Sequence, residues 1–241
     1  MRRKHQFDFK EFSVTQEKSA MKVGTDGVLL GAWAQVMDAQ HILDIGTGTG
    51  VIALMMAQKS SKSYIQAIDI SEEAVSEANH NFNHSPWGDR LEATNISLQE
   101  FIENQPKGKY DLVVSNPPFF QQGSTEAAGK DRHQARQNST LSQADLLKAV
   151  DHLLSEHGLF SVILPYLEGL EFIKMAQEFS LHLHRQTAFF SKIEKPQERW
   201  LLEFGRKEQE IITAELVHYN SENGWTDDYR ALTKAFYTRL K

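Results

Sequence analysis

The sequence predicts an α/β fold built on a doubly wound, mostly parallel sheet of seven strands with an antiparallel C-terminal hairpin. Short apolar segments with strand character alternate with helical patterns along most of the chain, as expected for a parallel sheet covered by helices. A glycine-rich turn, 46–50, joins the first of these strands to the helix that follows it. The last two strands, within 181–191 and 198–207, have no helical segment between them, which predicts an antiparallel pair.

Each parallel strand is predicted where a short apolar run meets a turn, and each helix where apolar residues recur about every 3.6 positions. The parallel strands are expected at 41–46, 63–70, 90–97, 110–116 and 158–165. The helices are expected at 51–59, 71–82, 141–156, 168–179 and 227–240. Ser71 suits an N-cap, and His157 with Gly158 marks the expected end of the helix 141–156.

The composition indicates a globular protein and excludes several chemistries. Hydrophobic residues make up 40% of the chain and charged residues 24%, so a large core can form. The absence of cysteine excludes disulfides, thiolate zinc sites and cysteine nucleophiles. We find neither a signal peptide nor the run of about 18 apolar residues that spans a membrane, and we expect a monomeric cytoplasmic protein. The net charge of −6 argues against a broad nucleic-acid-binding surface, although a local patch is compatible with it.

The turn LDIGTGTG, residues 43–50, predicts a nucleotide-like ligand without phosphate. Gly46, Gly48 and Gly50 let a ligand approach the backbone at the carboxyl end of the first strand. Asp44, just before the turn, would repel a phosphate but attract an ammonium group. Asp69, at the tip of the second strand, can accept from a ribose diol. A nucleoside with a cationic amino-acid part fits these requirements, and S-adenosylmethionine is such a molecule.

The segment MKVGTDGVLLGAW, residues 21–33, precedes this turn and has two readings. Thr25 or Asp26 can cap a helix that starts after Gly24, or the segment can contact the cofactor. No linker, internal repeat or low-complexity tract divides the chain. We therefore expect one domain over 1–241, in which 1–35 is an extension that contributes to the cofactor pocket.

The strand DLVVSN ends in two prolines and two phenylalanines, and this turn is the predicted catalytic segment. Proline lacks an N–H group, so Pro117 and Pro118 end the strand and stiffen the turn. The side-chain oxygen of Asn116 and the carbonyl of Pro117 can both accept from one NH₂ group. Phe119 offers a flat face for a planar base or amide. The role of Phe120 stays open between stacking and packing.

Together these motifs resemble the amino-group methyltransferases of the class I S-adenosylmethionine-dependent family, which have a Rossmann-like fold. The stretches KVGTDGVLLGAW, LDIGTGTG, SNPPFFQQG and ALTKAFY resemble more closely the bacterial tRNA (adenine-N6)-methyltransferases that modify adenosine 37 of a valine tRNA. The resemblance covers nearly the whole chain. The LDIG and NPPF motifs occur in many methyltransferases, whereas KVGTDG is narrower.

The resemblance implies a set of site residues and two departures from the family pattern. The implied cofactor-binding residues are Lys22, Thr25, Asp44, Gly46, Gly48, Gly50, Asp69, Ile70 and Ser97, and the implied catalytic turn is Asn116, Pro117, Pro118 and Phe119. Ser97 stands where the class often has an aspartate near the cofactor adenine. Phe119 stands where adenine-N6 enzymes often have tyrosine, and guanine-N2 methyltransferases of ribosomal RNA frequently have the phenylalanine.

The polar segment 121–140 holds a cluster of cations that can contact RNA. Lys130, Arg132, His133 and Arg136 lie within seven residues beside the predicted catalytic turn. A solvated surface loop is the alternative interpretation. No histidine pair has the spacing of a metal-binding motif, so we expect no metal ion.

The leading hypothesis is therefore N6-methylation of an adenosine in the anticodon loop of a tRNA, with S-adenosylmethionine as cofactor and tRNA as partner. Two alternatives remain open. One is N2-methylation of guanine in ribosomal RNA, and the other is N5-methylation of a protein glutamine, whose amide suits the same turn. A module that binds RNA or cofactor without catalysis is disfavoured, because Asn116 accompanies the cofactor glycines.

Overall fold

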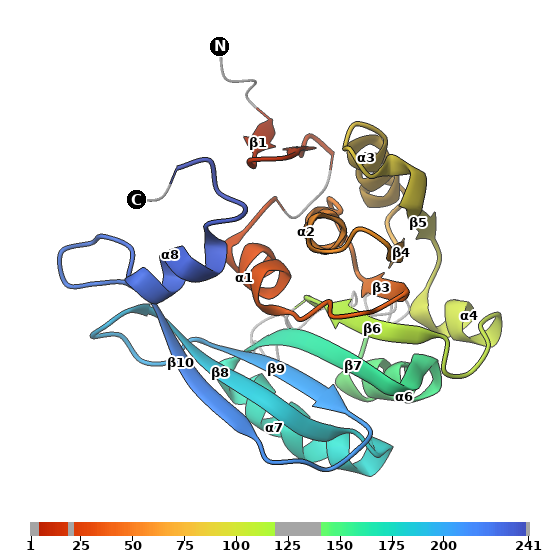
Figure 1. Cartoon of the computed structure of the whole chain (residues 1–241). Coiled ribbons are helices and arrows are strands. Elements are labelled where there is room, and N and C mark those ends of the chain that lie inside the picture. Colours follow the sequence, from red (N-terminus) through yellow and green to blue (C-terminus); the bar gives the residue numbers. More distant parts are fainter. Residues whose placement is uncertain (1–4, 19–21, 119–140, 240–241) are drawn as a thin grey trace, which may run out of the picture.

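The computed structural model describes residues 5–18, 22–118 and 141–239, and its centre is an eight-stranded sheet (Figure 1). The strands of this sheet are β3 (His41–Ile45), β4 (Tyr64–Asp69), β5 (Leu91–Asn95), β6 (Tyr110–Ser115), β7 (Leu154–Pro165), β8 (His182–Lys192), β9 (Arg199–Gly205) and β10 (Ile212–Tyr219). Their order across the sheet is β10-β8-β9-β7-β6-β3-β4-β5. Strand β9 runs antiparallel to both of its neighbours, and all other neighbouring pairs are parallel.

This topology confirms the predicted fold class and adds one strand to it. The chain winds outward from β3 in two directions, through β4 and β5 on one side and through β6 and β7 on the other. The predicted antiparallel pair is β8 with β9. The strand missing from the prediction is β10, at the edge of the sheet. Its first four residues are exposed, so it has no buried apolar run for sequence analysis to detect.

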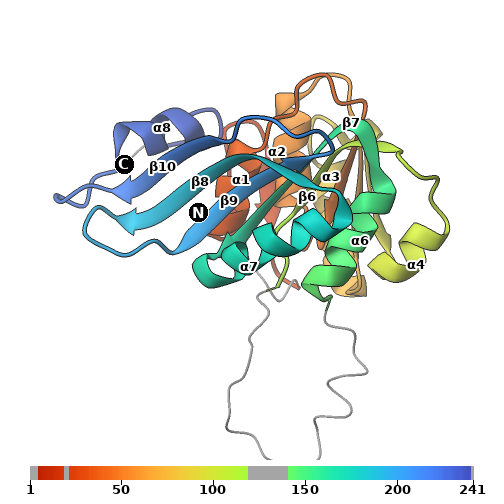
Figure 2. The same ribbon diagram turned by 90° about the horizontal axis from the view of Figure 1, so that it is seen from below.

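Helices cover both faces of the sheet (Figures 1 and 2). One layer contains α1 (Thr25–Trp33), α2 (Val51–Lys59), α3 (Glu72–Asn83) and α8 (Asp227–Thr233), and the other contains α4 (Leu98–Glu103), α6 (Gln143–Leu153) and α7 (Tyr166–Ala176). Short 3-10 turns lie at Gly88–Arg90 and Gln177–Phe179. Among the described residues, no helix is long and apolar enough to cross a membrane.

Two predicted helix ends were wrong. Helix α6 ends at Leu153, and β7 begins at once, so His157 and Gly158 lie inside a strand. Leu154 is buried and pairs with Tyr110 across a register shift, which draws the chain into the sheet earlier than the glycine suggests. Gly158 serves close packing there, because an added Cβ would lie 2.8 Å from the Tyr110 carbonyl oxygen. Helix α8 is also shorter than predicted and ends at Thr233.

The N-terminal residues form a small two-stranded sheet that packs against the end of the chain. Its antiparallel strands are β1 (Gln6–Asp8) and β2 (Ser13–Thr15). Phe9 forms a bridge to Tyr237, and the Lys10 backbone N–H donates to the Phe236 carbonyl at 2.8 Å. The ring of Phe9 stacks on that of Phe12 with centroids 4.5 Å apart. Residues near both ends of the described chain are therefore held against each other and against the helical layer that contains α1.

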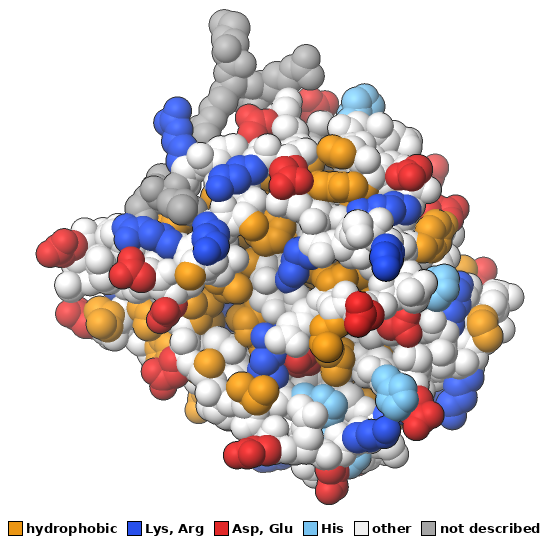
Figure 3. All heavy atoms as spheres, viewed as in Figure 1, with side chains coloured by type: hydrophobic (Ala, Val, Ile, Leu, Met, Phe, Trp, Pro, Cys, Tyr) orange, Lys and Arg blue, Asp and Glu red, His pale blue; other side chains and the backbone are white. Residues whose placement is uncertain are grey.

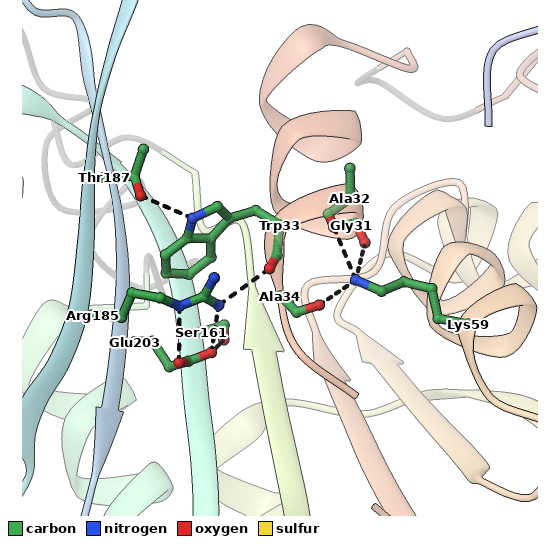
Figure 4. A network of polar contacts seen from close by, with 9 residues as sticks. All are labelled: Gly31, Ala32, Trp33, Ala34, Lys59, Ser161, Arg185, Thr187 and Glu203. Atoms are coloured by element: carbon green, nitrogen blue, oxygen red, sulfur yellow. Dashed lines mark hydrogen bonds and ion pairs between the residues drawn. The ribbon is translucent and has the colours of Figure 1, made fainter. Parts of the chain in front are cut away.

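A buried polar network holds the C-terminal end of α1 against the sheet (Figure 4). The guanidinium carbon of Arg185 lies 3.6 Å from the centroid of the Trp33 ring, and Arg185 Nη2 lies 2.8 Å from the Glu203 carboxylate. Trp33 Nε1 donates to Thr187 at 2.9 Å. The ion pair is shielded, with side-chain exposures of 15% for Arg185 and 5% for Glu203. It is therefore screened much less than a surface pair.

On the opposite side, the Lys59 ammonium caps the same helix end. It donates to the carbonyl oxygens of Gly31 at 3.3 Å, Ala32 at 2.9 Å, and Ala34 (Figure 4). These are carbonyls at the end of α1, where a cation also complements the helix dipole. Helix α1 is thus fixed from both sides, and its first turn is held at a defined place.

Removing one partner of this buried ion pair should strongly destabilise the protein. We expect Glu203→Gln to lower the free energy of unfolding by about 3–5 kcal/mol, because Arg185 keeps its charge in a buried site. Urea denaturation followed by circular dichroism measures this change. The control is Glu156→Gln, which breaks an exposed pair with Lys207 at 3.9 Å and should cost less than about 1 kcal/mol. Equal effects of the two substitutions would contradict the assigned role of the network.

Candidate active site

A cavity of about 810 Å³ lies at the carboxyl ends of the parallel strands. Its volume is near the upper end of the usual range for small-molecule sites, about 300–1,000 Å³. Its wall comes from the strand-end turns after β3, β4, β5 and β6, from the start of α1, and from β8, β9 and β10. The residues of the turns and of α1 that line it include Lys22, Thr25, Asp26, Gly46, Thr47, Gly48, Asp69, Ile70, Ser71, Ile96, Gln99, Asn116 and Pro118.

The turn between β3 and α2 requires its three glycines. Gly46, Gly48 and Gly50 have φ angles of 74°, 54° and 81°, in the left-handed region that other residues rarely adopt. At Gly50, which precedes α2, an added Cβ would lie 2.5 Å from the Phe82 ring. Gly46 has no neighbour within 4 Å of such an atom. The turn therefore packs against α3 at one end and presents bare backbone to the cavity at the other.

Asp44 lies behind this turn rather than in the cavity wall. It is fully buried, and its Oδ2 accepts from Thr47 Oγ1 at 2.7 Å, while Thr47 lines the cavity. Its Oδ1 is buried and has no hydrogen-bond partner in the described part of the chain. Burial raises the pKa of Asp44 to about 7, and the Asp69 carboxylate adds to this increase. A cation in the cavity would favour the ionised form of this carboxyl.

Asp69 joins the ends of β3 and β4. Its Oδ2 accepts from the Gly48 backbone N–H at 2.9 Å, and its Oδ1 accepts from the Ser71 N–H at 3.0 Å. Ser71 is the N-cap of α3, as predicted, and its Oγ accepts from Ala74 N. The next residue, Ile70, is 63% exposed and lines the cavity, where it offers apolar surface to a ligand.

Ser97 has a structural use of its own. Its Oγ caps α4 by accepting from the Glu100 N–H at 3.2 Å, and the cavity wall includes its neighbours Ile96 and Leu98 but not Ser97 itself. Gly50 and Pro117, like Asp44, also lie outside the wall. The predicted residues Phe119, Lys130, Arg132, His133 and Arg136 lie outside the described residues, as does Phe120.

The first turn of α1 closes the cavity from the side of the N-terminal extension. Gly24 precedes the helix and provides no side-chain cap. Asp26, in the first turn, forms an ion pair with Arg199 at the start of β9, with Nε and Oδ2 2.9 Å apart. The positive end of a helix dipole therefore borders the cavity, and an ion pair ties it to the hairpin of β8 and β9.

Asn81 connects the N-terminal extension to the glycine turn. Its Nδ2 donates to the Thr15 and Thr49 carbonyls, each at 2.9 Å, and its Oδ1 accepts from the Thr15 N–H at 2.8 Å. Next to it, the buried carboxylate of Glu77 accepts from the backbone N–H groups of Glu17 and Lys18. These hydrogen bonds therefore fix the position of β2 relative to the glycine turn that lines the cavity.

Asn116 and His218 both line the cavity and each has a buried polar atom without a hydrogen-bond partner among the described residues. The Oδ1 of Asn116 is buried, and none of the described residues donates to it. Ser115, just before it, fixes the end of β6 by donating from Oγ to the Ile45 carbonyl at 2.9 Å. Pro117 is buried and Pro118 is exposed in the wall. Buried acceptors are rarely left unsatisfied in native proteins, and the place of this one in the cavity wall makes it a candidate acceptor for a donor group of a bound ligand.

The sequence did not indicate the wall formed by β8, β9 and β10. Phe189, Ser191, Glu198, Arg199, His218 and Tyr219 line this part of the cavity. They lie far from the glycine turn in sequence and on strands without a motif. Among the described residues, no group of three or more histidine or acidic side chains is placed to hold a metal ion, and the absence of metal stays a prediction.

Comparison with known proteins decides the family. The sequence profile of the methyltransferase small domain matches residues 19–180. A protein of Flavobacterium psychrophilum named tRNA1(Val) (adenine(37)-N6)-methyltransferase is 44% identical over 235 residues, which cover 97% of this chain and 100% of that protein. A protein of the same name from Escherichia coli is 39% identical over 98% of this chain and 96% of its own length. The chain belongs to the methyltransferase small domain family.

Solved structures agree with the fold of a methyltransferase. A predicted O-methyltransferase from Agrobacterium tumefaciens superimposes with a TM-score of 0.68 at 16% identity, over 90% of this chain and 99% of that one. Geranyl diphosphate C-methyltransferase from Streptomyces coelicolor, solved with S-adenosyl-L-homocysteine, gives 0.51 at 11% identity, over 70% and 73% of the two chains. The family resemblance read from the sequence motifs is confirmed.

The raised pKa of Asp44 predicts a stability that depends on pH. The unfolded carboxyl titrates near 3.8 and the folded one near 7, so the folded state loses stability as pH rises between these values. We expect Asp44→Asn to stabilise the ligand-free methyltransferase at pH 8, by up to about 4 kcal/mol. Urea denaturation between pH 5 and 8 measures the difference, which should shrink as pH falls. Asp38→Asn, at an exposed position, is the control, and a difference independent of pH would contradict this role.

Proposed function

We propose that the chain transfers the methyl group of S-adenosylmethionine to N6 of an adenosine in the anticodon loop of a tRNA, at position 37 of a valine tRNA. The observation that carries this proposal is the unpartnered, buried Oδ1 of Asn116 in the same cavity as the glycine turn. The names of relatives that are 39% and 44% identical over nearly the full chain support the tRNA substrate.

The cavity suits S-adenosylmethionine in charge and shape. Asp69 lines the cavity and its carboxylate would accept from the ribose hydroxyls, and the exposed side chain of Ile70 would give apolar surface for the adenine. The uncapped start of α1 suits the carboxylate of the methionine part, since helix N-termini attract anions. The buried Asp44, linked to Thr47, suits the cationic part. Lys22 and Thr25 line the same cavity, which supports their assignment as cofactor contacts.

The protein's contribution to the reaction is positioning and electrostatic stabilisation. The cofactor, when bound, supplies an electrophilic methyl group on a sulfonium. Asn116 Oδ1 and the Pro117 carbonyl would accept the two protons of the adenine amino group and orient the nitrogen lone pair toward that methyl. As the N–C bond forms, one amino proton leaves to water and the sulfonium becomes a neutral thioether. No metal or covalent intermediate is needed, because orientation alone can contribute much of the acceleration.

The product nucleoside tests this function directly. Tritiated S-adenosylmethionine is incubated separately with unmodified tRNA, ribosomal RNA and protein, and the labelled RNA is digested to nucleosides. We expect the label in N6-methyladenosine from tRNA. Label in guanosine of ribosomal RNA, or in protein glutamine, would replace this function by one of the two alternatives. The monomeric state, the cytoplasmic location and the RNA contacts of 130–136 remain predictions.

Asn116→Ala should separate chemistry from cofactor binding. We expect loss of turnover by about 100-fold or more, because the amino group loses its orienting acceptor. Affinity for S-adenosylhomocysteine, measured by calorimetry, should change less than about threefold, because the proposed role of this oxygen is to accept from the amino group of the substrate base and not from the cofactor. Asn104→Ala, at an exposed helix end, is the control and should keep both properties. Loss of cofactor affinity in Asn116→Ala would refute the assigned role.

A further inference from the structure

The cavity extends past the catalytic turn, onto strands that the proposed chemistry does not use. We call the part formed by Phe189, Ser191, Glu198, Arg199, His218 and Tyr219 the hairpin lobe. These residues lie near the C-terminal ends of β8 and β10 and at the start of β9. The three strands form one side of the sheet (Figure 2). In strand order, β6 with Asn116 separates this lobe from the glycine turn.

His218 is the residue of this lobe whose buried ring nitrogen has no hydrogen-bond partner among the described residues. It is 8% exposed and lies between the rings of Tyr219 and Tyr229, with centroids 3.9 and 3.8 Å away. Its Nε2 is buried, and no described residue forms a hydrogen bond with it. Burial lowers the pKa of His218 to about 4, so at neutral pH the ring is uncharged, with one donor and one acceptor nitrogen. Leaving such a nitrogen unpaired is costly, and a partner from outside the chain would remove that cost.

The other members of the lobe suit a planar, polar ligand. Phe189 is buried and forms apolar backing for the lobe, while Tyr219 is half-buried and stacks on His218 with one face. The Tyr219 ring is therefore the aromatic surface that can stack with a base. Ser191 Oγ donates to the Glu198 carboxylate, which leaves further acceptor capacity on that carboxylate. Arg199 adds a cation next to its Asp26 partner. The lobe thus combines an aromatic ring with a neutral imidazole, a carboxylate and a guanidinium. Proteins bind unstacked nucleotides with side chains of these types.

We propose that the hairpin lobe binds the base of a nucleotide adjacent to the methylated adenosine, and that His218 forms a hydrogen bond with the edge of that base. This inference rests on the proposed function. The target base itself must reach Asn116, directly after β6, whereas β9, β8 and β10 are the second, third and fourth strands from β6. At about 4.8 Å per strand, this places the lobe about 10–19 Å away, too far for the same base. The proposed contacts with the cofactor ribose and adenine lie on the other side of β6, at β3, β4 and β5. The start of α1, proposed for the methionine carboxylate, adjoins the lobe through the Asp26–Arg199 pair.

The charge of the protein fits recognition by a local pocket. On the face shown in Figure 3, the cationic and acidic side chains of the described residues are interspersed rather than gathered into one broad cationic patch. The net charge of −6 also argues against a broad electrostatic attraction between the protein and RNA. Contacts to unstacked bases in a loop would then contribute a larger share of the selectivity.

The test uses short anticodon stem-loop RNAs in which each nucleotide flanking the target adenosine is replaced in turn. With the wild-type chain, kcat/KM should fall about tenfold or more for the disfavoured flanking bases. His218→Ala should lose this discrimination, with its kcat/KM on the preferred RNA reduced to the value for the disfavoured ones. His218→Gln, which keeps a donor and an acceptor, should retain part of it. His182→Ala, on β8 outside the cavity wall, is the matched control and should discriminate like the wild type.

Several results would overturn the proposal. A wild-type enzyme indifferent to the flanking bases would do so, as would His218 variants that discriminate like the wild type. An equal decrease in the kcat/KM of His218→Ala on every RNA would assign the residue to the fold instead. Weaker affinity of this variant for S-adenosylhomocysteine would assign it to the cofactor site. If the wild type methylates no tRNA stem-loop, the proposed function itself is refuted. This result differs from methylation without discrimination between flanking bases, which would refute only the role of His218.

Discussion

The burial of helix α1 is the constraint on which the cavity depends. From Gly27 to Trp33 every residue of this helix is buried, so it has no solvent face and must be covered on all sides. Gly31 lies so close to α2 that an added Cβ would be 2.5 Å from Met55 Sδ. The Arg185–Glu203 pair and Lys59 then satisfy the polar groups at its C-terminal end. With that end immobilised, the first turn of α1 can form a wall of the cavity.

The same arrangement explains how segments from the first and last thirds of the chain line one cavity. The N-terminal strands lie against the last residues of the described chain through Phe9 and Tyr237, while Asn81 ties β2 to the glycine turn. The Asp26–Arg199 pair links the start of α1 to the hairpin of β8 and β9. Segments far apart in sequence are thus held around a shared ligand space by hydrogen bonds and ion pairs rather than by the parallel sheet alone.

Sequence reasoning succeeded where local chemistry dictates structure. Short-range patterns predict the left-handed glycines after β3 and the Ser71 cap. They also predict Asp69 as the last residue of one buried strand and Asn116 as the residue after another. It failed where partners are remote. Strand β10 has an exposed first half and no local signal, so neither its place beside β8 nor the contribution of His218 to the cavity could be anticipated. Ser97 caps α4, and its predicted contact with the cofactor stays a prediction.

The central claim is that Asn116 Oδ1 is kept unpartnered for the amino group of the substrate. A crystal structure with S-adenosylhomocysteine and a tRNA anticodon stem-loop tests it most directly. The account predicts that the adenine N6 lies within about 3.2 Å of both Asn116 Oδ1 and the Pro117 carbonyl oxygen, with the cofactor sulfur on the opposite side of the nitrogen. A complex in which Asn116 Oδ1 instead bonds to a protein group, with the adenine amino group elsewhere, would contradict it.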